Sequence, residues 1–361
     1  MRYARQTVLA DLGQEGQAAF AEAKVLIVGV GGLGSPLALY LAAAGVGCLG
    51  LVDADRVSLS NLQRQILFQT PDIGQTKVTI AKNNLEALNP DVRCVLHPVF
   101  LDNQNAEDIA KDYEIIVDAS DNFETKYLLN DLCVKLNRPL VYGSILRFKG
   151  QASVFWAERG PCYRCLFPRL PREAIPNCAE AGVLGALAGV IGSIQALEVM
   201  KLILLMKDRL PVHHETLLGR LLSFDAATMT QTINRLPKDP DCPVCSRARE
   251  DIVLPELDLS CALETEAVPN LARDWQNYRW IDVREQGEWD QGRVPNALHW
   301  PLSKLNQGLI PEKISGPTVI YCQSGVRSRQ ALKRLKAEDF VAVLHYPEGF
   351  GGWVGPVERG K

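Results

Sequence analysis

The chain has 361 residues, of which 47% are hydrophobic and 22% charged, so it is long enough for two packed domains. Its formal net charge of −3 gives no reason to expect nucleic acid or an acidic membrane as a partner. The chain contains ten cysteines, and its N-terminus lacks the apolar run of a signal peptide. This favours a reducing cytoplasm and metal-bound or reactive thiols over a disulfide framework.

The first half of the chain alternates short apolar strands with helices, the pattern of a doubly wound α/β domain with a parallel sheet. The stretch 183–194 is too short to span a bilayer and is predicted to be a buried helix. The predicted parallel strands are 25–28, 48–52, 115–119 and 140–143, and candidates for antiparallel strands are 151–156 and 221–224.

A glycine-rich loop, Gly29-Val30-Gly31-Gly32-Leu33-Gly34, follows the first strand and opens a helix. Such glycines allow a tight turn and let a phosphate approach the N–H groups at the start of the helix. Asp53 follows the next strand, where an acid can hydrogen-bond ribose hydroxyls. Taken alone, this pattern also fits a nicotinamide dehydrogenase.

Further polar residues favour nucleotidyl transfer over redox chemistry. The segment Ser60-Asn61-Leu62-Gln63-Arg64-Gln65 and Lys77 add cationic and polar groups beyond the ribose position. They suit a reaction in which negative charge accumulates around an α-phosphate. Asp121 and Asn122 follow strand 115–119, and an aspartate at that sheet edge can hold magnesium. The alternative is that Arg64 and Lys77 are ordinary solvated surface charges.

Two cysteine pairs with the same two-residue gap predict a structural zinc site. Cys162 and Cys165 form one pair, and Cys242 and Cys245 form the other. Four thiolates complete a tetrahedral zinc site and leave no open position for chemistry. The alternative is four unrelated buried cysteines.

A second domain follows a charged, proline-bearing linker. We expect a first domain over 1–246, a linker over 247–268 and a smaller α/β domain over 269–361. In the smaller domain the sequence predicts strands at 280–283 and 318–321 and a helix at 327–336. The segment from Cys322 to Arg327 lies between the second strand and the helix, where loop N–H groups can cradle an anion and favour a thiolate. Its four intervening residues, one fewer than in cysteine phosphatases, favour sulfur transfer over phosphate ester hydrolysis.

The first domain resembles the adenylyltransferases that activate ubiquitin-like sulfur carriers, as in molybdopterin and thiamine biosynthesis. The resemblance rests on the Arg-x-x-Arg near the start, the glycine loop, the 60–65 and 74–77 segments, Asp121-Asn122 and the cysteine pairs. It implies that Arg5 reaches into the site of a second subunit, and hence a homodimer. It also implies that ATP and Mg²⁺ bind at Gly29, Gly31, Gly32, Gly34, Asp53, Asp55, Ser60, Asn61, Arg64, Gln65, Lys77, Asp121 and Asn122.

The second domain resembles the rhodanese family. The segments 281–285, 292–297 and 349–353 are similar to its signature segments, and the chain departs from them at Arg293, where histidine is common, and at Asn296, where glycine is common. The resemblance implies that Cys322 carries sulfur as a persulfide, with Arg327 at the start of the following helix. An inert buried cysteine is the alternative.

Cys178 lies between a proline-bearing stretch and the apolar helix. Similarity to the family suggests that this thiol accepts an acyl group as a thioester or closes a disulfide with a sulfur donor. An unreactive cysteine at a helix start is equally compatible with the sequence.

Together these features predict a cytoplasmic enzyme that adenylates the C-terminal glycine of a small carrier ending in Gly-Gly. Sulfur from a Cys322 persulfide, loaded by a cysteine desulfurase or thiosulfate, then gives a carrier thiocarboxylate. One alternative is a ubiquitin-type activator that uses a Cys178 thioester, with the rhodanese unit as a docking module. The other is the nicotinamide dehydrogenase. The sequence does not identify the biosynthetic pathway.

Overall fold

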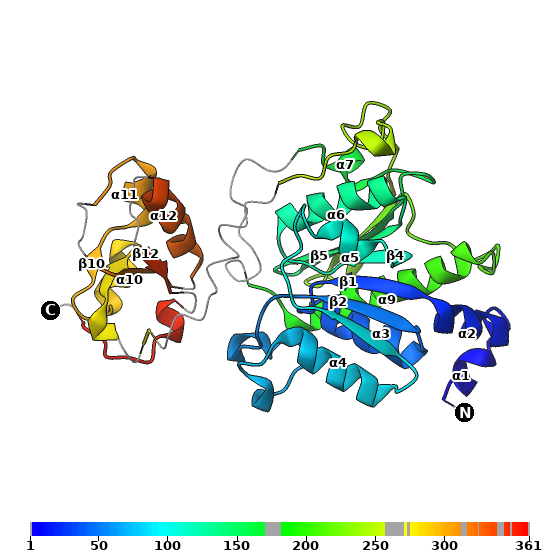
Figure 1. The fold of residues 1–361 in the computed structure, drawn as a ribbon, viewed down its shortest axis with the longest axis horizontal. Helices are drawn as coiled ribbons and strands as arrows, with labels where there is room; N and C mark the ends of the chain where they lie inside the picture. Colours follow the sequence, from blue (N-terminus) through cyan, green and yellow to red (C-terminus); the bar gives the residue numbers. More distant parts are fainter. Residues whose placement is uncertain are drawn as a thin grey trace. The chain divides into compact units, whose positions relative to one another are not determined.

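The computed structural model divides the chain into two compact units, Met1–Leu257 and Asp258–Lys361 (Figure 1). It describes residues 2–169, 182–256, 271–272, 275–311, 316–323, 325–337, 343–346 and 349–359. Both units are α/β, in agreement with the fold class predicted from the sequence.

The first unit is built on an eight-stranded sheet in the order β3-β2-β1-β4-β5-β6-β7-β8. The five strands from β3 to β5 in this order run parallel, and β6, β7 and β8 continue the sheet antiparallel. The two strands proposed as antiparallel from the sequence are therefore confirmed. The strands are β1 Lys24–Val28, β2 Cys48–Val52, β3 Arg93–His97, β4 Ile115–Asp118, β5 Leu140–Leu146, β6 Lys149–Phe155, β7 Arg220–Asp225 and β8 Thr230–Arg235.

Helices cover both faces of this sheet, as Figure 1 shows. Alternate side chains of β1 enter two separate cores, because successive residues of a strand point to opposite faces. Val25 and Ile27 pack with α3, α4 and α9, whereas Leu26 and Val28 pack with α5 and α6. The helices are α1 Ala4–Thr7, α2 Gly13–Glu22, α3 Gly34–Ala44, α4 Lys77–Leu88, α5 Ala106–Ala110, α6 Phe123–Leu136, α7 Tyr163–Leu166 and α9 Gly185–Met206.

Helix α9 extends twelve residues beyond the stretch predicted from the sequence. Its 22 residues have the length and hydropathy to cross a membrane. Within the first unit, however, it packs against α3, β5 and β6 and carries two buried polar side chains, Gln195 and Glu198. Gln195 donates to the carbonyl of Asp118, and Glu198 accepts from the N–H of Leu217, so the helix is a core element of the sheet domain.

The second unit contains a four-stranded parallel sheet in the order β10-β9-β11-β12. Its two faces are covered by separate apolar clusters, one containing Ile281, Ile320 and Leu332 and the other Trp280, Val319 and Tyr346. The strands are β9 Arg279–Asp282, β10 Leu298–His299, β11 Thr318–Tyr321 and β12 Val343–His345, and the helices are α10 Gln286–Gln291, α11 Leu302–Asn306 and α12 Val326–Ala337.

Candidate functional site

The glycine loop lies between the end of β1 and the start of α3, at the carboxyl edge of the parallel strands. Gly29 has a φ of +92°. A Cβ there would lie 2.7 Å from the carbonyl oxygen of Ala119, the residue that follows β4, so a side chain would not fit. The N–H groups of Gly31 and Gly32 donate to no group in the described part of the chain. Free N–H groups at the entry to a helix form a cradle for a phosphate.

Asp53 and Lys77 are held together beside this loop. Asp53 accepts from the N–H of Val30 at 2.8 Å and from the N–H of Asp55 at 2.9 Å. Lys77 Nζ lies 2.8 Å from Asp55 Oδ2 and 3.9 Å from Asp53 Oδ2. Burial alone would lower the pKa of Lys77, but the two carboxylates outweigh it and raise the pKa, so the lysine is a fixed cation.

Arg64 and Gln65 also lie against the glycine loop. A Cβ on Gly32 would lie 3.5 Å from Arg64 Cδ, and one on Gly31 would lie 3.5 Å from Gln65 Nε2. Arg64 is oriented by donation from Nη1 to the carbonyl of Ser60 at 3.0 Å. Gln65 Oε1 is buried and has no hydrogen-bond partner among the described residues. The structure therefore brings Arg64 and Gln65 of the 60–65 segment to the glycine loop.

Asn61 and Asn122 have local roles that the sequence analysis did not identify. Asn61 Oδ1 accepts from the N–H of Ser58 at 3.2 Å in the turn that carries the segment. Asn122 is the N-cap of α6, where its Oδ1 accepts from the N–H of Thr125 at 2.8 Å. Asp121, next to it, is exposed after β4. Arg5 is also exposed, on α1.

A buried ion pair beneath the Asp121 loop was missed in the sequence. Lys126 Nζ lies 2.9 Å from Asp118 Oδ2, and it also donates to the carbonyls of Ser120 and Gly143 at 3.1 and 3.0 Å. Burial works to lower the pKa of Lys126, and the attraction of Asp118 outweighs it and raises the pKa. Because Lys126 holds Ser120, it fixes the backbone that presents Asp121.

These groups fit a nucleoside triphosphate and its metal ion. Free loop N–H groups and three cationic or acceptor side chains, Arg64, Lys77 and Gln65, surround the glycine loop. Carboxylate oxygen is the ligand that Mg²⁺ prefers, and Asp121 is exposed at this edge. A magnesium ion there would neutralise charge on the phosphates.

The four cysteines predicted to bind zinc come together in one cluster. Cys162 and Cys242 have sulfur atoms 3.5 Å apart, as do Cys165 and Cys245, and all four sulfurs lie within 4.8 Å of one another. Tetrahedral zinc with bonds of about 2.3 Å places sulfurs about 3.8 Å apart, so the donor set fits this ion. Hydrogen bonding from Cys162 lowers the pKa of Cys245 to about 5.

In the second unit, Cys322 follows β11 and begins the predicted anion loop. Its carbonyl accepts from the N–H of Phe350 at 2.7 Å, and the carbonyl of Gln323 accepts from the N–H of Gly351 at 2.9 Å. Ser328 Oγ, from the first turn of α12, lies 3.5 Å from Cys322 Sγ. The cysteine is buried against the apolar cluster of this unit. Backbone hydrogen bonds from the 349–353 segment therefore fix the start of the loop.

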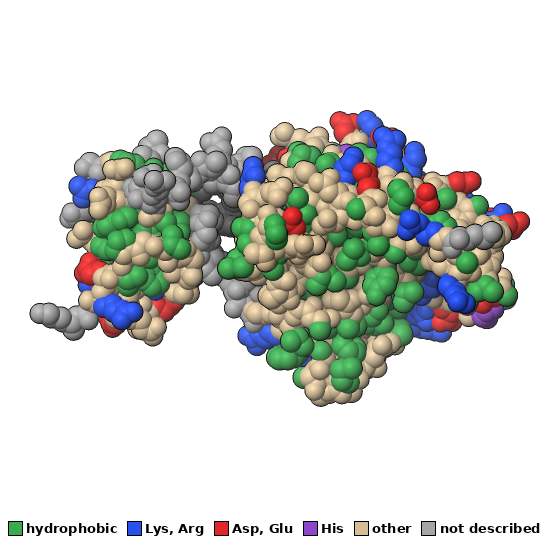
Figure 2. Space-filling model, turned by 90° about the horizontal axis from the view of Figure 1, so that it is seen from below, with side chains coloured by type: hydrophobic (Ala, Val, Ile, Leu, Met, Phe, Trp, Pro, Cys, Tyr) green, Lys and Arg blue, Asp and Glu red, His purple; other side chains and the backbone are tan. Residues whose placement is uncertain are grey.

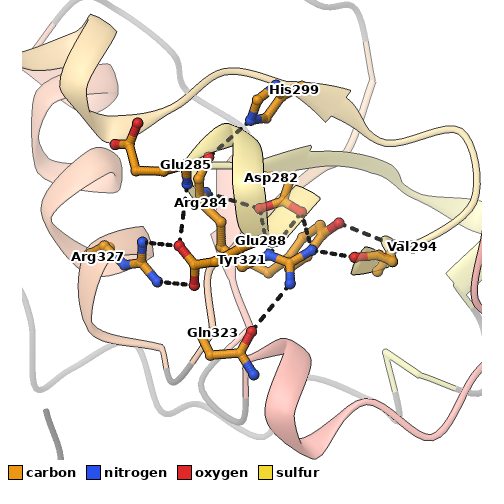
Figure 3. Close-up of polar contacts among 10 residues, drawn as sticks. Asp282, Arg284, Glu285, Glu288, Val294, His299, Tyr321, Gln323 and Arg327 are labelled. Atoms are coloured by element: carbon orange, nitrogen blue, oxygen red, sulfur yellow. Dashed lines mark hydrogen bonds and ion pairs between the residues drawn. The ribbon is translucent and has the colours of Figure 1, made fainter. Parts of the chain in front are cut away.

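Two arginines with acidic partners frame this loop (Figure 3). Arg284 is buried, pairs with Asp282 at 2.6 Å and donates to Gln323 Oε1 at 3.1 Å. Arg327 makes two bonds of 2.6 Å to the carboxylate of Glu288 on α10. The sequence identified Arg327, but it gave no reason to select Glu288, because an acid on a short helix is usually a solvated side chain.

The two departures from the rhodanese pattern have physical explanations. Asn296 adopts a φ of +59°, in the left-handed region where glycine is favoured and asparagine is tolerated. Arg293 pairs with Glu358 and lies 4.6 Å from the ring centroid of Trp289. Cys178, the remaining predicted catalytic residue, lies outside the described residues.

Comparison with protein-family models assigns both units. The ThiF family matches residues 3–244, and the rhodanese-like domain matches residues 266–355. The chain belongs to the ThiF family. Both resemblances predicted from the sequence are thereby confirmed.

Curated relatives match this ThiF-family chain over most of its length. A probable adenylyltransferase/sulfurtransferase MoeZ of Mycobacterium tuberculosis is 40% identical, over 98% of this chain and 92% of its own. An adenylyltransferase and sulfurtransferase MOCS3 of Aedes aegypti is 37% identical, over 92% of this chain and 81% of its own. A sulfur carrier protein adenylyltransferase of Thermus thermophilus is 45% identical, over 73% of this chain and 96% of its own. This ThiF-family chain is accordingly an adenylyltransferase with sulfurtransferase activity.

The fold of the first unit also occurs among solved structures. A structure of E. coli MccB with MccA-N7isoASN matches with a TM-score of 0.59 and 22% identity, over 68% of this chain and 74% of that chain. At this identity the likeness concerns the fold of the ThiF-type unit.

Proposed function

We propose that this enzyme adenylates the C-terminal glycine of a small ubiquitin-like sulfur carrier and then converts that carboxylate to a thiocarboxylate. The observation that carries the proposal is the set of groups at the glycine loop. Free loop N–H groups, Arg64 and Lys77 meet at the sheet edge where Asp121 is exposed. The printed name of the Thermus thermophilus relative supports a sulfur carrier as the substrate.

The adenylation step needs charge neutralisation more than a general base. The carboxylate of a C-terminal glycine is already ionised at neutral pH, since its pKa is about 3.3–3.7. One of its oxygens attacks the α-phosphorus, and the bond from that phosphorus to the bridging oxygen breaks as pyrophosphate leaves. Arg64 and Lys77 are the fixed cations that oppose repulsion between the two anions.

Sulfur transfer is assigned to Cys322, loaded as a persulfide by a cysteine desulfurase or by thiosulfate. The terminal sulfur attacks the acyl carbon, and the carbon–oxygen bond to AMP breaks. Attack of a second thiol on Cys322 Sγ then releases the carrier thiocarboxylate and leaves a disulfide, which a reducing thiol reopens. Cys178 is a candidate for the second thiol, or for a thioester in the alternative ubiquitin-type route.

We assign zinc to the four cysteines, magnesium to the Asp121 edge, and a homodimer to the functional state. Arg5 is exposed on α1, where a second subunit can receive it. Hydrophobic side chains spread over the face of the first unit seen in Figure 2. Among the exposed apolar residues of α3 and α9 are Tyr40, Val190 and Leu197, a surface suited to burial against a second copy. The eight cysteines among the described residues form no disulfide, which fits a reducing cytoplasm.

Carrier-dependent ATP–pyrophosphate exchange tests the proposal. A carrier ending in Gly-Gly should start exchange of labelled pyrophosphate into ATP, and the same carrier lacking its last glycine should not. NAD binding without carrier-dependent exchange would instead support the dehydrogenase alternative.

A further inference from the structure

A second group of metal-binding side chains lies on the surface of the first unit, away from the residues assigned above. Asp11 lies between α1 and α2, and His213 and His214 lie in the turn after α9. Nε2 of each histidine lies 3.1 Å from Oδ2 of Asp11. The donor atoms of all three side chains lie within 4.8 Å of one another.

The backbone turn makes two neighbouring histidines converge on one point. The N–H of His214 donates to the carbonyl of Pro211 at 2.8 Å and closes the turn. The two imidazole rings have centroids 4.6 Å apart and planes at 78°, yet both direct Nε2 toward Asp11. Tetrahedral zinc with nitrogen and oxygen ligands places donor atoms about 3.3 Å apart, close to the observed spacing.

The other histidines of the chain are engaged differently. Nε2 of His97 lies 3.0 Å from the hydroxyl of Tyr113, and the Nε2 atoms of His299 and His345 face backbone carbonyls. In contrast, the side chains of His213, His214 and Asp11 are 65%, 37% and 46% exposed. An ion from solvent can therefore reach all three donors without opening the core.

We propose that Asp11, His213 and His214 bind a divalent transition ion of the zinc type, at a site separate from the four cysteines. Imidazole nitrogen suits zinc, nickel and copper, and the carboxylate adds opposite charge. Three protein ligands leave a fourth position for water or a small anion.

The ion would tie the segment before α2 to the turn after α9. Asp11 is six positions along the chain from Arg5, so the ion anchors the N-terminal arm, defined as residues 2–12. The assignment of this metal site does not depend on the proposed function, because its evidence is the geometry of three side chains. Its consequence for Arg5 rests on the proposed dimer.

The same distances also suit two imidazole N–H groups that donate to one carboxylate, and metal occupancy separates the two arrangements. The full-length protein is stripped of metal under reducing conditions, dialysed to equilibrium against Zn²⁺ and analysed by mass spectrometry for bound zinc. We expect two zinc ions per wild-type chain, but one in the double variant His213→Ala/His214→Ala and one in Asp11→Asn. Asp208→Asn, which removes an exposed carboxylate just before the turn, should retain two.

Hydrogen exchange gives a second readout that does not depend on activity. Zinc should slow exchange in residues 4–12 of the wild-type chain and leave the same segment of the double variant unchanged. Co²⁺ should give a thiolate absorption band in every variant, because the cysteines are intact. The proposal is overturned if the double variant and Asp11→Asn each bind as many zinc ions as the wild type. Circular dichroism checks the fold, and Asp11→Asn decides if the double variant does not fold.

Discussion

Lys126 Nζ lies 2.9 Å from Asp118 Oδ2, and both side chains are almost completely inaccessible to solvent. Asp118 ends β4, and Lys126 lies on α6, so this pair ties the helix to the sheet directly below the loop that presents Asp121.

We expect Lys126→Met to destabilise the first unit strongly. Removing the lysine leaves Asp118 as a buried charge without its cation, which costs about 3–5 kcal/mol. Denaturant unfolding followed by circular dichroism measures the change. Lys111→Met, which breaks an exposed pair with Asp108, is the control and should have no measurable effect. Equal unfolding midpoints for the two variants would contradict the role of the buried pair.

Asp121→Ala should abolish ATP–pyrophosphate exchange while the protein stays folded. The side chain is exposed, so its loss removes no packing, but it takes a carboxylate from the predicted magnesium site. Loss of a group that stabilises transition-state charge costs about a hundredfold to a thousandfold in rate. Asp112→Ala removes another exposed carboxylate of the same unit and should keep wild-type exchange. Undiminished exchange in Asp121→Ala would remove this assignment.

The Glu288–Arg327 pair predicts an acid-sensitive second unit. Hydrogen bonding from Arg327, opposed by partial burial, lowers the pKa of Glu288. A carboxyl with a lowered folded-state pKa contributes stability above its unfolded pKa of about 4.3 and loses it as the pH falls through the folded value. The stability difference between wild type and Glu288→Gln should therefore be constant near neutral pH and shrink in acid.

Tryptophan fluorescence can follow this difference, because five of the six tryptophans lie in the second unit. Asp290→Asn, on the same helix, is the matched control. A Glu288→Gln variant whose stability deficit stays the same at every pH would show that the ion pair does not contribute.

Metal removal should loosen the first unit. The four cysteines join α7, with Cys162 as its N-cap and Cys165 within it, to residues 242–245, and Val134, Val244 and Ile252 pack around them. Cys165→Ser should lose the thiolate absorption band of a cobalt-substituted protein, and it should melt at a lower temperature. Cys48→Ser, a half-buried cysteine outside the cluster, should retain both properties. A stripped wild type with an unchanged melting temperature would argue against a structural ion.

The sequence predicted the central strands of both sheets but not their edges. The strands that were missed, β3 and β8 in the first unit and β10 and β12 in the second, are the edge strands. Central strands are buried on both faces and appear as continuous apolar runs, as in β1 and β4. All six residues of β8 are exposed, so its sequence contains no hydrophobic pattern to detect.

The candidate sites were predicted where local spacing carries the chemistry. The cysteine pairs, the glycine loop and the Cys322 loop are each short motifs, and the structure brings their members together. Lys126 and Glu288 were missed because each pairs with a residue of another element. Asp118 ends β4, eight residues before Lys126 on α6, and Arg327 lies on α12, 39 residues after Glu288 on α10. Such pairings depend on tertiary packing.

The mass of the carrier after reaction tests the central claim most directly. The full-length enzyme is incubated with ATP, Mg²⁺, a persulfide donor and a carrier ending in Gly-Gly, and the carrier is analysed by mass spectrometry. The account predicts that one oxygen is replaced by sulfur with wild type, and that Cys322→Ser yields only adenylated or unmodified carrier while keeping pyrophosphate exchange. A carrier bound to Cys178 as a thioester without sulfur incorporation, or thiocarboxylate formed equally well by Cys322→Ser, would contradict it.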